Sequence, residues 1–65
     1  MESEQLHAEV SFEGVTVEIF RRVVSGEAGR QTWRLKSEGG FDRIVTGPIH
    51  KARKVAKEAI LDGEA

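Results

Sequence analysis

The sequence predicts an α+β fold, in which an antiparallel meander sheet of three to four strands carries one C-terminal helix on one of its faces. Two observations indicate the sheet. Apolar and polar residues alternate within segments between residues 6 and 36, and glycines separate these segments at 13–14, 25–29 and 37–40. A third observation indicates the helix, because the apolar spacing becomes three and four from residue 49 onward.

The first two strands are predicted to form a hairpin. Residues 6–12, LHAEVSF, alternate between apolar and polar, and residues 15–24, VTVEIFRRVV, form the second strand. Glu13 and Gly14 separate them, and a two-residue loop with glycine in second place is typical of a tight hairpin turn. One apolar face then continues across both strands, through the pairs Phe12–Val15, Val10–Val17 and Ala8–Ile19.

The third strand is predicted at residues 30–36, RQTWRLK, with Gln31, Trp33 and Leu35 on one side. The fourth is predicted at residues 41–46, FDRIVT. Its facing stays open, because its apolar residues lie on both sides of the strand. An edge strand tolerates such a pattern.

The helix is predicted to begin near Pro48, since proline has no N–H to leave unpaired in a first turn. Thr46 or Gly47 would be its N-cap, and Gly63 its C-cap. The buried stripe of the helix would consist of Ile49, Ala52, Val55, Ala56, Ala59 and Ile60. The predicted core combines this stripe with Val10, Phe12, Val15, Val17, Ile19, Trp33 and Leu35.

The 65 residues are predicted to make a single domain, with residues 1–5 disordered and 63–65 frayed. A domain this small buries only about 60% of its unfolded surface, so pairing with a second copy would make it more stable.

The acidic N-terminal segment does not resemble a secretory signal, and no apolar run approaches the ~20 residues that cross a bilayer. The chain has no cysteine, which fits a reducing compartment. We therefore expect a soluble, cytoplasmic protein with no membrane partner.

The charges are distributed unevenly along the chain. The formal net charge is −1, but all ten bases lie between Arg21 and Lys57, together with only three acids. Lys51, Arg53 and Lys54 occupy the first two turns of the predicted helix, where the helix dipole favours acids. Bases placed there would add to the free N–H groups of the helix start and favour an anion.

No catalytic or metal-binding pattern is present, so we expect no enzyme and no cofactor. The two histidines, His7 and His50, have no metal-ligand spacing to each other or to a carboxylate, and cysteine is absent. The glycines at 39–40 precede a strand and not a helix, so they do not form a phosphate loop. Glu58 and Asp62 share a helix face, where carboxylates are usually solvated.

Residues 33–45, WRLKSEGGFDRIV, resemble the core of the small, uncharacterised YegP-type β-β-β-α family, and KARKVAKEAI resembles its helix. The resemblance covers roughly residues 15–61; the family's Gly-Tyr segment has no counterpart, because the chain lacks tyrosine. It implies this fold and assembly in pairs, with no established activity. The architecture alone is also similar to the plant AP2-type and phage-integrase arm-binding domains, which bind DNA through an open sheet face.

Two functional hypotheses follow. The first is a non-enzymatic module that binds DNA or RNA through its open sheet face and its helix start. Its contact residues would be Phe20, Arg22, Arg30, Arg34, Lys36, Lys51, Arg53 and Lys54. The alternative is a protein-interaction or homodimerising domain, whose basic surface meets an acidic partner or the acidic ends of this chain or of a second copy.

Overall fold

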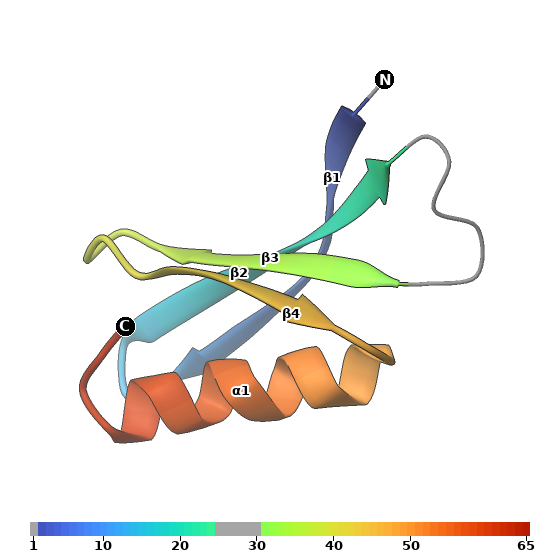
Figure 1. Cartoon of the computed structure of the whole chain (residues 1–65). Helices are drawn as coiled ribbons and strands as arrows, with labels where there is room; N and C mark the ends of the chain where they lie inside the picture. Colours follow the sequence, from blue (N-terminus) through green and yellow to red (C-terminus); the bar gives the residue numbers. More distant parts are fainter. Residues whose placement is uncertain (1, 25–30) are drawn as a thin grey trace.

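The structure is a computed structural model that describes residues 2–24 and 31–65. Within these residues, four strands form one antiparallel sheet in the order β1-β2-β3-β4, and one helix follows them (Figure 1). The elements are β1 (Glu2–Phe12), β2 (Val15–Val24), β3 (Thr32–Ser37), β4 (Asp42–Thr46) and α1 (Ile49–Leu61). Because α1 packs on one face of the sheet, the predicted α+β meander is confirmed.

The first hairpin has the predicted turn and register. Glu13 and Gly14 both have positive φ angles, 52° and 80°, as in the type I′ turns that suit two-residue hairpin loops. The turn sets the pairs Phe12–Val15, Val10–Val17 and Ala8–Ile19, as predicted. A single glycine and one glutamate held at positive φ therefore define the whole central register of β1 and β2.

A β-bulge in β1 changes which face its first residues occupy. The register shifts between Leu6 and Ala8, so that Leu6 pairs with Phe20. The inserted residue is His7, whose ring lies 4.9 Å from that of Trp33 on the helix side of the sheet. Leu6 consequently lies on the face opposite α1, whereas simple alternation placed it beside Ala8.

Both ends of the chain are more regular than the sequence suggested. Residues 2–5 pair with β2 as part of β1, so the strand begins before the predicted position 6. At the other end, Gly63 has a φ of 76° and its N–H donates to the carbonyl of Ile60. The N–H of Glu64 donates to the carbonyl of Ala59, which completes a Schellman motif in which Asp62, and not the predicted Gly63, is the C-cap.

The structure settles the facing of β4. Val45 pairs with Trp33 and is only 7% exposed on the helix side, while Ile44 pairs with Arg34 on the other face and is 46% exposed. The predicted strand boundaries at 30–36 and 41–46 shift to those of β3 and β4. The prediction that Gln31 belongs to β3 is wrong, because this exposed residue precedes the strand.

The helix α1 begins after Pro48, which is itself the N-cap in place of Thr46 or Gly47. Pro48 has an extended backbone, and no side chain caps the first turn. No helix in the described part of the chain is long and apolar enough to span a bilayer.

The core lies between α1 and the facing side of the sheet. Its buried residues are Val17, Ile19, Trp33, Leu35, Val45, Ala52, Ala56, Ala59 and Ile60. Val10 and Val15 are partly buried against it, but the prediction for Phe12 is wrong, since this residue lies beside the turn and is 40% exposed. The indole N–H of Trp33 donates to the carbonyl of Gly47 at 2.8 Å, which ties β3 to the loop before α1.

Candidate binding surfaces

The predicted contact residues lie on two surfaces with the sheet between them. One is the open face, the side of the sheet opposite α1, which carries Phe20, Arg22, Arg34 and Lys36. The other is the outer side of α1, which carries Lys51, Arg53 and Lys54. Arg30 lies outside the described residues. The two groups therefore form two separate surfaces, one on the open face and one on α1.

The arginines of the open face form ion pairs with carboxylates. Arg34 binds Asp42 through two parallel hydrogen bonds, 3.0 Å from Nε to Oδ1 and 2.6 Å from Nη2 to Oδ2. Its Nη1 also lies 3.3 Å from Oε1 of Glu4, and the other oxygen of Glu4 lies 3.3 Å from Nε of Arg22. Glu4 and Asp42 thus join β1, β2, β3 and β4 across the open face.

These contacts shift the pKa values of both Asp42 and Arg34. The hydrogen bonds from Arg34 lower the pKa of Asp42, because they favour its ionised form. The same hydrogen bonds from Asp42, followed by those from Glu4, raise the pKa of Arg34. Arg34 therefore stays charged at any physiological pH.

The depressed pKa of Asp42 predicts acid sensitivity. An unfolded chain binds a proton at this carboxylate more readily than the folded chain does, so stability falls as the pH drops below about 4 and through the lower folded pKa. We expect Asp42→Asn to flatten this decline, measured as the urea midpoint at pH 7, 4 and 3. Glu64→Gln, which removes a carboxylate away from Arg34, is the control. Identical pH profiles for wild type and Asp42→Asn would contradict the prediction.

An apolar row crosses the middle of the open face. Leu6, Phe20, Arg34 and Ile44 are cross-strand neighbours on β1 to β4. Leu6 is 52% exposed, whereas Phe20 is half-buried, with the Lys36 ammonium 5.9 Å from its ring centroid. Phe20 is thus less open to a ligand than the sequence suggested, while the row as a whole leaves apolar surface in water.

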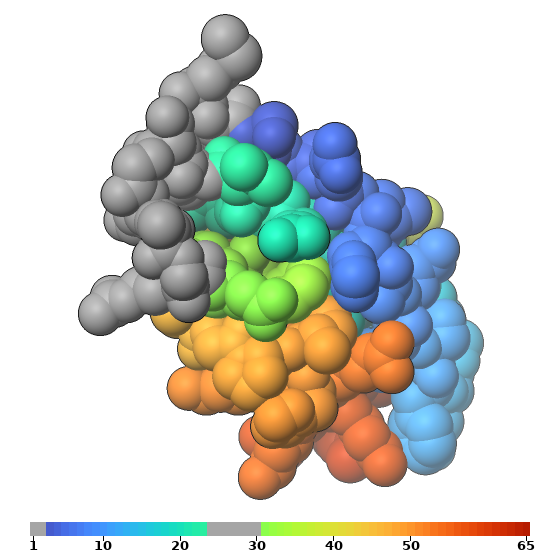
Figure 2. All heavy atoms as spheres, turned by 90° about the vertical axis from the view of Figure 1, so that its right-hand side faces the viewer, coloured from blue at the N-terminus to red at the C-terminus, as the bar shows by residue number. Residues whose placement is uncertain are grey.

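The bases on the outer side of α1 differ from the arginines of the open face, because no carboxylate among the described residues forms a salt bridge with them. The helix bases are Lys51, Arg53, Lys54 and Lys57, all exposed, with no acid in the first turn. The salt bridges formed within residues 2–24 and 31–65 lie on the open face, and none involves a helix base. Figure 2 views the molecule from the end at which α1 begins, and the first part of the helix, in orange, is open to view. Lys57 was not among the predicted contacts, although its spacing of three from Lys54 could have indicated it.

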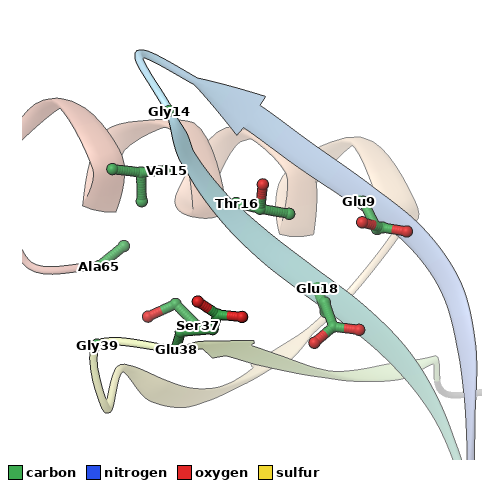
Figure 3. A pocket seen from close by; sticks show the side chains of 9 residues that line it. All are labelled: Glu9, Gly14, Val15, Thr16, Glu18, Ser37, Glu38, Gly39 and Ala65. Atoms are coloured by element: carbon green, nitrogen blue, oxygen red, sulfur yellow. The ribbon is translucent and has the colours of Figure 1, made fainter.

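A cavity of about 550 Å³ lies between the start of β2, the β3–β4 turn and the C-terminal residue (Figure 3). It contains none of the predicted contact residues. Its lining includes Glu9, Glu18 and Glu38, an acidic set that disfavours an anion. Within the described ranges, no group of three histidine or carboxylate side chains is arranged to hold a metal ion.

Comparison with known proteins gives no match to any family model, to any curated protein or to any solved structure. The resemblances to the YegP-type family and to the AP2-type and integrase arm-binding domains therefore stay predictions.

Proposed function

We propose that the chain is a non-enzymatic module that binds the phosphate backbone of nucleic acid through the helix bases. One observation carries the proposal: these four bases are exposed and form no salt bridge within the described residues, whereas Arg22 and Arg34 lie against Glu4 and Asp42. A base without a carboxylate partner can neutralise a phosphate without first breaking an existing ion pair.

The helix start adds to this preference. The N-terminal end of α1 carries partial positive charge, and its first N–H groups receive no side-chain cap. Each phosphate that a base neutralises also releases condensed counterions from the nucleic acid, which drives binding at low salt. On the open face, a phosphate would instead have to displace Asp42 from the two-pronged contact with Arg34, so the net gain there would be small.

The test is fluorescence anisotropy of labelled duplex DNA, single-stranded DNA and RNA at about 50 and 200 mM salt. For duplex DNA we expect log K to fall with log salt with a slope of about −3, since four bases can neutralise at most about four phosphates. Replacing Lys51 and Lys54 with glutamine should make the slope shallower by about two. Lys36→Gln, which removes one positive charge from the open face, is the control and should leave the slope unchanged. Binding unaffected by the helix variants, or absent at low salt, would contradict the proposal.

The open face supports a second candidate function, which is pairing with another copy of the chain. The observation in its favour is the exposed apolar row, in which Leu6 and Ile44 flank Phe20 and Arg34. The sheet has a helix on one face only, so a second copy would cover the other face and extend a small core.

The mass in solution tests this candidate, by light scattering over a concentration series. We expect a mass of two chains, and its loss in Ile44→Asp, which places a charge in the row. Leu61→Asp is the matched control, because Leu61 is similarly exposed, at 57%, but lies on α1. A single-chain mass at about 1 mM, where even a pair with a free energy of about −4 kcal/mol would be populated, would contradict self-pairing.

A further inference from the structure

The strand register arranges the open face in three rows, which decide how two copies can meet. The middle row is Leu6, Phe20, Arg34 and Ile44. The row toward the β2–β3 loop is Glu4, Arg22, Thr32 and Thr46. The row toward the β1–β2 turn is Glu9, Glu18, Lys36 and Asp42.

A face-to-face pair of identical chains is self-complementary only about a two-fold axis lying between the two sheets. Two directions of that axis keep the strands of the two copies aligned, one along the rows and one along the strands. An axis along the middle row would place Arg34 against the partner's Arg34 and Glu4 against the partner's Glu9. Both contacts oppose like charges, which is unfavourable in a contact that excludes water, and the attractive contact of Arg22 with the partner's Glu18 offsets them only in part.

An axis parallel to the strands, between β2 and β3, gives a different set of contacts. Each row then meets the same row of the partner in reverse order, so Leu6 meets the partner's Ile44. Phe20 meets the partner's Arg34, a cation beside an aromatic ring. Glu18 meets the partner's Lys36. The one opposing pair of like charges in this geometry is Glu9 and the partner's Asp42.

We infer that the chain pairs through its open face about a two-fold axis parallel to the strands, and that Glu18 and Lys36 determine this geometry. The inference rests on the self-pairing proposed above, in which a second copy of the chain covers the open face. The two sheets would pack about 10 Å apart with their strands within about 30° of each other. Both α1 helices would lie on the outside of the pair, which leaves the helix bases free for phosphate.

Charge reversal with mixing tests the geometry. Glu18→Lys and Lys36→Glu each oppose like charges twice in the symmetric pair, so each variant alone should dimerise about 10- to 100-fold more weakly than wild type. An equimolar mixture of the two should regain the wild-type dissociation constant, because each introduced charge meets its opposite across the axis. Circular dichroism of each variant checks that the fold is retained, and Glu58→Lys, the same reversal on α1, should dimerise as wild type does.

The outcomes separate the geometry from the self-pairing itself. A wild-type pair with recovery on mixing supports the inference. A wild-type pair without recovery, or variants that dimerise unchanged, overturns the geometry and leaves self-pairing standing. A wild-type chain that stays single at every concentration overturns both.

Discussion

Replacing Trp33 with alanine is expected to remove most of the folding free energy. Trp33 is 2% exposed and is the largest fully buried side chain among the described residues. It contacts the His7 ring, and its N–H binds the carbonyl of Gly47. Tryptophan-to-alanine changes in a core cost about 3–5 kcal/mol, which is comparable with the about 3–5 kcal/mol that a domain of this size gains from one core.

The measurement is urea unfolding of Trp33→Ala followed by circular dichroism, which we expect to show no cooperative transition at 25 °C. Trp33→Phe separates packing from the hydrogen bond. It keeps an aromatic ring but leaves the Gly47 carbonyl without that donor, at a cost of about 1–3 kcal/mol. Leu61→Ala, at an exposed position, should change stability by less than about 0.5 kcal/mol. A Trp33→Ala protein that unfolds at the wild-type midpoint would refute the role assigned to this side chain.

The second large effect is expected from Ala56→Leu. Ala52, Ala56 and Ala59 are almost fully buried where α1 faces the sheet, and their small side chains allow the helix to lie close to it. Leucine at position 56 adds three carbons to a filled space, so either the helix moves outward or neighbouring side chains leave their preferred rotamers. Such overpacking costs about 1–3 kcal/mol.

Urea unfolding again provides the measurement, and Glu58→Leu is the matched control, because it adds a leucine to the exposed side of the same helix. The contact between α1 and the sheet should be loosened only in Ala56→Leu. If both variants unfold at the same denaturant concentration, the close approach of α1 does not limit stability.

Local rules predict most of the fold because the decisive signals are short-range. The turn at Glu13 and Gly14 sets three residue pairs by itself, and the alternation in 15–24 survives intact as β2. The change of apolar period after Pro48 marks α1 for the same reason. Each of these signals involves residues within one turn, strand or helix.

The bulge at His7 is the feature that alternation does not predict. Continuing the hairpin pairs without a bulge would pair Glu4 with Val23 on the helix side, whereas the inserted residue pairs Glu4 with Arg22. The carboxylate that meets Arg22 and Arg34 therefore depends on a single extra residue in one strand. Whether a strand bulges depends on its tertiary surroundings, here the Trp33 ring that His7 contacts.

The candidate site was only partly predictable because the pairing of its charges depends on strand register. The contact between Arg34 and Asp42 joins neighbouring strands on one face, and the sequence left the facing of residues 41–46 open. The bases of α1 were predictable, since a helix position depends on spacing alone. The sequence did not show that carboxylates bind the arginines of the open face, because charge counts along a chain do not show which charges lie side by side in a sheet.

The two sides of the sheet differ in charge, because the arginines of the open face are paired with carboxylates and the helix bases form no salt bridge within the described residues. On the open face, Arg22 and Arg34 lie against carboxylates, whereas α1 carries four bases and one carboxylate, Glu58. The field of such a distribution extends about 8 Å into physiological salt, before any contact forms. A polyanion approaching the molecule would turn it helix-first, so the orientation of the encounter complex would be selected before binding, and added salt would slow association by shortening that range.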